Sequence, residues 1–247
     1  SVGENKYAMN IANVQRIIQA ETLTDIPNAH VHIDGMMSYE DKVIKVLNFR
    51  KLIGIETYEN ELTELFVTLK QAHSAWVEAL KLSIQTGVKF TKTLDPHACG
   101  LGKWIDSFIA YDDHIIEILN ELSDFHKQLH STGGVALNKY EDDKEESLRI
   151  LNEDIANIYS YAMSSLDKFV NELSLVANSL QKLIIYDNDG VLFAIKVDKI
   201  EDIAHVQESE FINAGEEHDV NEFLELEGVL DLDDILINVI KTVVLPK

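Results

Sequence analysis

The sequence predicts an α+β protein with more than one domain, in which a block of helices interrupts β structure. Residues 1–58 and 184–247 carry short runs of β-forming residues separated by turn residues. Residues 60–181 contain a single proline, and their apolar residues recur at the three- and four-residue spacing of helices. We therefore expect a β domain made from two halves of the sequence, with a four-helix bundle inserted between them.

The first β segment contains two runs that resemble strands. "YAMNIANVQRII" (7–18) is rich in β-forming residues, and "DKVIKVLNFRKLIGI" (41–55) alternates between two faces before it ends at Gly54. Two stretches between them, "TDIPNAH" (24–30) and "HIDGMMSYED" (32–41), supply turn-forming residues. This pattern predicts a strand along each run.

The middle block predicts four helices. In the first, a stripe of apolar residues continues through His73 and Trp76. Acidic residues open the last and longest helix, where they interact favourably with the helix dipole. Antiparallel helices with short connections form a bundle. The predicted helices cover residues 61–85, 102–109, 112–132 and 142–183.

The second β segment opens with a hairpin signal. Two β-forming runs within residues 183–203 flank Asn188-Asp189-Gly190, which favours a tight turn. Neither β segment looks like a complete domain by itself. Domain insertions are tolerated best at exposed loop tips. We therefore place the boundaries of the inserted bundle near residues 58–61 and 180–184.

The charge of the chain excludes some classes of partner. The formal net charge is −22, with 43 acidic and 21 basic residues. Phosphate groups and anionic membranes are bound through Lys and Arg, so we expect neither nucleic acid nor a membrane as a partner. One cysteine forms no internal disulfide, and the N-terminus shows no secretion signal. A cytoplasmic location is expected.

Four residues of the helical block have the chemistry of a metal site. His126 and His130 are four residues apart and therefore share one helix face. His73 lies on the apolar stripe of the first helix, and Cys99 precedes the next helix, where the helix N-terminus favours a thiolate. Three imidazoles and one thiolate suit tetrahedral Zn²⁺. The spacing alone leaves another interpretation open, namely a packed cysteine and three unrelated core histidines.

The motifs around these residues resemble the chemoreceptor zinc-binding (CZB) domain. "HSAWVEAL", "CGLGKW" and "HKQLH" occur in the order of that family's motifs, across residues 60–181. The resemblance implies a bundle that holds Zn²⁺, with the cysteine as a candidate sensor of zinc or hypochlorous acid. It implies that Trp76 and Trp104 pack in the core and around the ligands. The implied ligands are His73, Cys99, His126 and His130.

The flanking segments resemble the CheW-like domain of bacterial chemotaxis. The first half is similar in "DIPNAHVHIDGMM" and in "NFRKLIG", where Arg50 takes the position of the family's arginine. The second half is similar in "GVLFAIKVDKIEDI" and "LEGVLDLDDILINVI". The resemblance implies two small five-stranded barrels and a non-enzymatic adaptor that couples chemoreceptors to the histidine kinase CheA.

Together these features predict a chemotaxis adaptor whose bundle responds to zinc or an oxidant. Three other functions remain open from the sequence. A zinc hydrolase or lyase needs an open coordination position, which four protein ligands do not leave. The bundle can instead be purely structural or a zinc store, or the β domain can bind a different partner. The long helix within residues 142–181 also makes a homodimer plausible.

Overall fold

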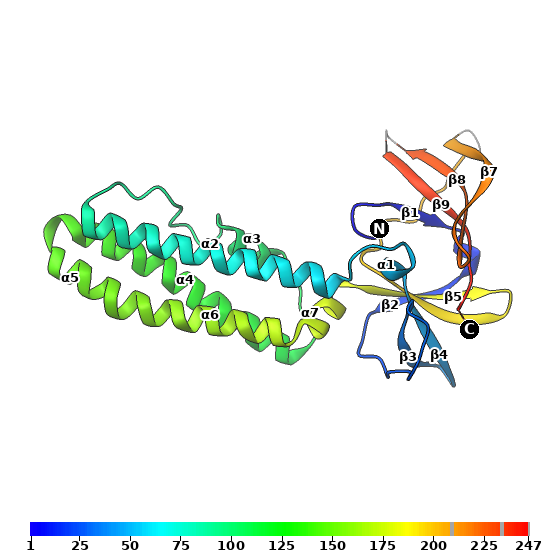
Figure 1. The fold of residues 1–247 in the computed structure, drawn as a ribbon, viewed down its shortest axis with the longest axis horizontal. Helices are drawn as coiled ribbons and strands as arrows, with labels where there is room; N and C mark the ends of the chain where they lie inside the picture. Colours follow the sequence, from blue (N-terminus) through cyan, green and yellow to red (C-terminus); the bar gives the residue numbers. More distant parts are fainter. Residues whose placement is uncertain (208–209, 233–234, 247) are drawn as a thin grey trace. The chain divides into compact units, whose positions relative to one another are not determined.

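The chain divides into two compact units, one mainly of β structure and one of helices (Figure 1). In the computed structural model the described residues are 1–207, 210–232 and 235–246, and side chains are described outside 213–220. The β unit combines Ser1–Tyr58 with Ala177–Lys247, and the helical unit is Glu59–Val176. Each unit is therefore considered by itself.

A five-stranded sheet joins the two ends of the chain within the β unit. Its strand order is β2-β5-β6-β4-β3. β2 pairs with β5 antiparallel and β4 pairs with β6 parallel, so strands from both segments pair within one sheet. The strands are β2 (Val14–Gln19), β3 (Ile33–Tyr39), β4 (Lys42–Asn48), β5 (Lys182–Asn188) and β6 (Val191–Val197).

The second sheet of this unit has four strands in the order β1-β9-β8-β7. β1 pairs with β9 in parallel, with Tyr7 opposite Asn238, so this sheet also joins the two chain segments. A short 3₁₀ helix, η1 (Ile11–Asn13), carries the chain from β1 towards β2. The strands are β1 (Tyr7–Met9), β7 (Phe211–Asn221), β8 (Leu224–Leu232) and β9 (Ile235–Val243).

The prediction of two closed five-stranded barrels is wrong for the described residues. Both sheets are open, and one of them has four strands. A barrel closes only where its two edge strands pair. The outer edge of β3 is occupied instead by Thr24, whose backbone exchanges two hydrogen bonds of 2.9 Å with Met36. β1 has three residues and offers few groups for further pairing.

The predicted hairpin is present between β5 and β6. Asp189 and Gly190 have φ angles of 52° and 88°, the left-handed conformation that a tight hairpin turn needs. The Gly190 N–H donates to Asp187 Oδ1 at 2.7 Å, which closes the turn. The run over residues 41–55 differs from its prediction, because Asn48 ends β4 and caps a short helix, α1 (Phe49–Leu52).

The helical unit contains three long helical stretches and one short helix. Figure 1 shows α2, α4 and α6 lying lengthwise beside one another. The predicted helix over 142–183 is interrupted by a π-helical turn, η2, and by a break at Glu172. The elements are α2 (Tyr58–Thr86), α3 (Gly100–Ser107), α4 (Asp113–Asp142), α5 (Lys144–Arg149), η2 (Ile150–Ile155), α6 (Ala156–Asn171) and α7 (Leu173–Leu180), whose last four residues belong to the β unit.

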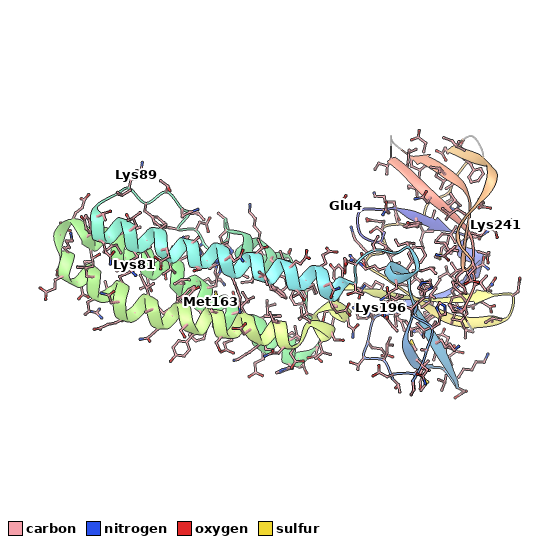
Figure 2. All side chains as sticks on the ribbon, in the orientation of Figure 1. Glu4, Lys81, Lys89, Met163, Lys196 and Lys241 are labelled. Atoms are coloured by element: carbon pink, nitrogen blue, oxygen red, sulfur yellow. The ribbon has the colours of Figure 1, made fainter. Side chains whose placement is uncertain are left out.

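Apolar packing holds these helices together. One core cluster brings Trp76 and Leu80 of α2 against Leu129 of α4 and against buried residues of η2. Charged side chains such as Lys81 and Lys89 are exposed on the surface of the helical unit (Figure 2). Among the described residues, none of the helices combines the length and the apolar character needed to cross a membrane.

A buried ion pair connects the two chain segments of the β unit. Arg50 is 3% exposed and donates to both carboxylate oxygens of Asp198 at 2.7–3.0 Å. Asp198 also accepts from Gln181 Nε2 at 3.2 Å. Arg50 donates to the Glu56 carbonyl at 2.9 Å and lies 4.6 Å from the ring centre of Tyr58. One arginine thereby contacts residues from both segments of the unit.

We predict that Asp198→Ala destabilises the β unit by about 3–5 kcal/mol, because it removes the carboxylate that pairs with the buried Arg50 guanidinium. Chemical unfolding followed by circular dichroism measures the loss. Lys199→Ala is the control, since its ion pair with Glu201 is exposed and should contribute about 0–1 kcal/mol. Equal stability of the two variants would contradict a structural role for the Arg50–Asp198 pair.

Candidate metal centre

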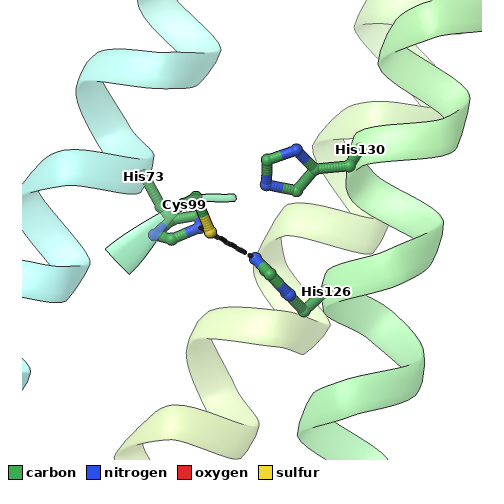
Figure 3. A group of neighbouring side chains, drawn as sticks. All are labelled: His73, Cys99, His126 and His130. Carbon is green, nitrogen blue, oxygen red and sulfur yellow. Dashed lines mark hydrogen bonds between the residues drawn. The ribbon is translucent and has the colours of Figure 1, made fainter. Parts of the chain in front are cut away.

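The four predicted ligands lie together inside the helical unit. Figure 3 shows His73 on α2, His126 and His130 on α4, and Cys99 beside them. The three histidines are at most 3% exposed, and Cys99 is half-buried. Their ligand atoms all lie within 4.8 Å of one another, which is close enough for all four to bind one ion.

The distances between the ligand atoms fit a tetrahedral metal. Cys99 Sγ lies 3.1 Å from His126 Nε2 and 3.7 Å from His73 Nε2, and the two nitrogens are 3.2 Å apart. Zinc bonds of about 2.0–2.1 Å to nitrogen and about 2.3 Å to sulfur place tetrahedral ligand atoms about 3.3–3.6 Å apart. The group therefore has the size of a zinc site.

His130 gives independent support for a bound cation. Its side chain is fully buried, and neither ring nitrogen has a hydrogen-bond partner in the described part of the chain. A buried polar atom without a partner costs about 1–3 kcal/mol. A metal ion at the centre would use one of these nitrogens.

Hydrogen bonding prepares His73 for the same role. Its Nδ1 lies 2.9 Å from the carbonyl oxygen of Leu69, one turn earlier on α2. With the ring proton on Nδ1, this bond fixes the ring and leaves Nε2 as a lone-pair donor towards Cys99 and His126. Metal-binding histidines commonly use their second nitrogen in this way.

Burial keeps the imidazoles neutral. Burial, reinforced by the neighbouring histidines, lowers the pKa of His126 to about 3. Burial and then His73 lower the pKa of His130 to about 4. Burial also lowers the pKa of His73. Neutral imidazole is the form that binds metal, so the three rings are in the binding form near neutral pH.

The pKa of the Cys99 thiol is raised, opposite to the direction expected from the sequence. Cys99 is the N-cap of α3, and its Sγ accepts from the Gly102 N–H at 3.3 Å. These backbone contacts lower the thiol pKa, as the sequence suggested, but burial is the larger effect and raises it. Formation of the thiolate in this site therefore depends on the cation itself.

Gly102 allows the turn that carries Cys99. A Cβ atom at this position would lie 1.7 Å from the carbonyl oxygen of Pro96, so a larger residue would displace the turn. The same carbonyl accepts from the Cys99 thiol at 3.4 Å. Gly102, the second glycine of "CGLGKW", thus lets the chain fold back on itself at Cys99.

The two tryptophans have different surroundings. The Trp76 ring lies 4.8 Å from the ring centre of His130 and therefore touches a ligand. Trp104 packs in an aromatic cluster, stacked on Phe108 and edge-on to Phe66 and Phe169. Arg50 belongs to the β unit and forms the ion pair described above.

Sequence reasoning missed the role of Gly133. A Cβ atom there would lie 2.4 Å from Cη2 of Trp76, so this glycine makes room for the indole one turn after His130. The available signal was the Gly133-Gly134 pair within an otherwise helical pattern, because a glycine inside a helix often has a packing reason.

Two family models match the chain. The CheW-like domain matches residues 1–77, and the chemoreceptor zinc-binding domain matches residues 73–137, a range that includes all four ligands of the centre. The resemblance stated from the sequence motifs is therefore confirmed for both families.

Individual relatives are distant. The chain is 23% identical over 66 residues to the chemotaxis protein CheW of Thermotoga maritima, a match that spans 27% of this chain and 44% of the relative. A crystal structure of the scaffolding protein TtCheW from Thermoanaerobacter tengcongensis matches with 13% identity and a TM-score of 0.45, over 98% of this chain and 84% of that one. On the two family matches, the chain contains a CheW-like domain and a chemoreceptor zinc-binding domain.

Proposed function

We propose that this protein is a chemotaxis adaptor that couples chemoreceptors to the kinase CheA and carries a zinc-binding regulatory bundle. The observation that carries the proposal is the buried group of His73, Cys99, His126 and His130, which lies within the zinc-binding family match of a chain that also contains a CheW-like domain. The protein acts in the cytoplasm in this proposal, where its single thiol stays reduced.

Zinc in this centre is structural or regulatory and not catalytic. Four protein ligands fill a tetrahedral shell, whereas a catalytic zinc keeps a position open for water. The ligands come from α2, from the turn before α3 and from α4, so one ion bonds three separate parts of the bundle. When bound, zinc supplies a tie between these parts whose free energy adds to folding.

The adaptor part of the proposal concerns the β unit. Residues 1–58 and 177–247 form one CheW-like domain in this proposal, interrupted by the zinc-binding bundle. The mixed strand order of both sheets supports it, because β4 pairs with β6 and β1 with β9 across the two segments. The match to a chemotaxis protein CheW suggests partners in the chemoreceptor–CheA assembly.

The bundle regulates the adaptor in this proposal through Cys99. Hypochlorous acid attacks a thiolate to give a sulfenic acid and chloride, and the oxidised sulfur is a poorer zinc ligand. Cys99 is the most accessible ligand of the four, since the histidines are buried. An oxidant that reaches the centre therefore meets sulfur first.

We predict about one zinc ion per chain in the wild type and none in His126→Ala/His130→Ala, because two of the four ligands are removed. Elemental analysis after dialysis measures the content. His114→Ala is the control, since this exposed histidine at the start of α4 lies outside the group of four. Zinc that survives the double substitution would refute the assigned ligands.

We predict that hypochlorous acid at about one equivalent releases zinc and that a thiol reductant restores binding, because sulfenic acid formation is reversible. A chromogenic chelator follows the released zinc, and mass spectrometry locates the added oxygen. Oxygen on a methionine instead of Cys99, with zinc release unchanged, would contradict the assignment of Cys99 as the sensor.

We predict that the zinc-loaded protein binds CheA or a chemoreceptor fragment and that His126→Ala/His130→Ala changes the dissociation constant. Calorimetry of both proteins against both partners measures the difference, with His114→Ala as the control. Unchanged affinity would make the bundle a purely structural element. Failure of the wild type to bind either partner would assign the β unit to a different partner.

A further inference from the structure

We propose that Trp76 is a positioning residue for the metal centre, which holds residues 87–99 against α4 so that Cys99 and His130 face one point. This inference rests on the proposed zinc function and adds a residue that binds no metal itself. Three sets of contacts carry it, one on each side of the indole and one along the chain to Cys99.

The first contact is a hydrogen bond to the segment that carries Cys99. Trp76 is 4% exposed, and its Nε1 donates to the carbonyl oxygen of Thr93 at 2.7 Å. Its ring also meets Phe90 edge-on at 5.5 Å. Residues 87–99 form neither helix nor strand, so contacts of this kind decide where the segment lies.

Local hydrogen bonds transmit this position from Thr93 to Cys99. The Asp95 N–H donates to Thr93 Oγ1 at 3.1 Å, and the His97 N–H donates to Asp95 Oδ1 at 2.9 Å. The Ala98 N–H donates to the Asp95 carbonyl at 3.2 Å, and the Cys99 sulfur accepts from the Gly102 N–H at 3.3 Å. Fixing the Thr93 carbonyl therefore fixes a turn whose last residue is the sulfur ligand.

The opposite side of the indole rests on α4. Its ring is tilted by 44° over the His130 ring at 4.8 Å, and Gly133 leaves the space that its far edge occupies. His73 is held by a hydrogen bond to Leu69, whereas the described contacts of His130 include none to its ring nitrogens. Packing against Trp76 therefore helps to orient the His130 ring, together with the rings of His73 and His126.

The two sides meet at His130. The indole of Trp76 donates to the Thr93 carbonyl at 2.7 Å, and its ring lies 4.8 Å from the His130 ring. The carbonyl fixed by Trp76 and the ring packed on Trp76 are therefore neighbours. A metal-bound histidine commonly donates its second N–H to a carbonyl of this kind.

The test compares Trp76→Phe with Trp104→Phe. Trp76→Phe keeps an aromatic ring near His130 and removes the N–H, whereas Trp104→Phe removes an indole from the aromatic cluster with Phe66 and Phe169. We expect Trp76→Phe to release zinc to a competing chelator about tenfold faster than wild type, since losing a contact that orients a ligand costs about 10–100-fold in affinity. Trp104→Phe should release zinc at the wild-type rate.

Cobalt(II) gives a signature that loss of stability alone would not change. The thiolate-to-cobalt charge-transfer band reports sulfur coordination, and we expect it to weaken in Trp76→Phe and to persist in Trp104→Phe. An unchanged band and an unchanged zinc release rate in Trp76→Phe would overturn this inference while the zinc site stands. A wild type that binds no zinc would instead refute the proposed function itself.

A measurement on the wild type covers the case in which Trp76→Phe fails to fold. The Trp76 indole proton should exchange with solvent more slowly than the Trp104 indole proton in the zinc-loaded protein, because it is buried in a hydrogen bond to Thr93. Exchange at the same rate in both indoles would show that the hydrogen bond from Trp76 to the Thr93 carbonyl is not maintained, and it would overturn the inference.

Discussion

Three imidazoles buried at one point are the constraint on which the helical unit depends. Burial, reinforced by neighbouring histidines at His126 and His130, keeps the three imidazoles neutral, and the Nε2 atoms of His73 and His126 lie 3.2 Å apart. Such an arrangement is unfavourable without a cation, because buried polar atoms without partners are costly. The same faces of α2 and α4 carry both the apolar core residues and the histidines. The packing of the two helices and the geometry of the centre therefore depend on each other.

The pairing of His126 and His130 was predictable because it is local, whereas the grouping of His73 and Cys99 with them was expected from the family resemblance. His126 and His130 share a helix face at any reasonable helix bounds, and Cys99 precedes a short helix whose start is marked by glycine. The direction of the Cys99 pKa was not predictable, because it depends on burial by parts of the bundle far away in sequence. The role of Gly133 escaped for the same reason, since only the folded structure brings it against Trp76.

In the β unit, individual strands were easier to predict than the way in which they pair. Periodicity located β2, β4 and the β5–β6 hairpin, whose turn chemistry lies within the sequence itself, but residues 33–39, which were expected to form turns, are β3. It did not predict which distant strands pair, because alternation specifies a buried face and not a neighbour. Closed barrels were expected from resemblance, whereas Thr24 occupies the edge of β3. Asn48 likewise turned an expected strand into α1, because a side-chain cap decided where β4 ends.

The proposed regulation requires that a change at the metal reach the β unit, and the chain offers defined places for this. The chain leaves the β unit at Tyr58 and returns at Ala177. On the β side, Arg50 contacts Glu56 and Tyr58, and its partner Asp198 accepts from Gln181. A rearrangement of α2 or α7 would therefore act on residues held by one buried ion pair. Separating a buried ion pair is costly, so the Arg50–Asp198 pair would resist such a rearrangement and hold the two chain segments of the β unit together.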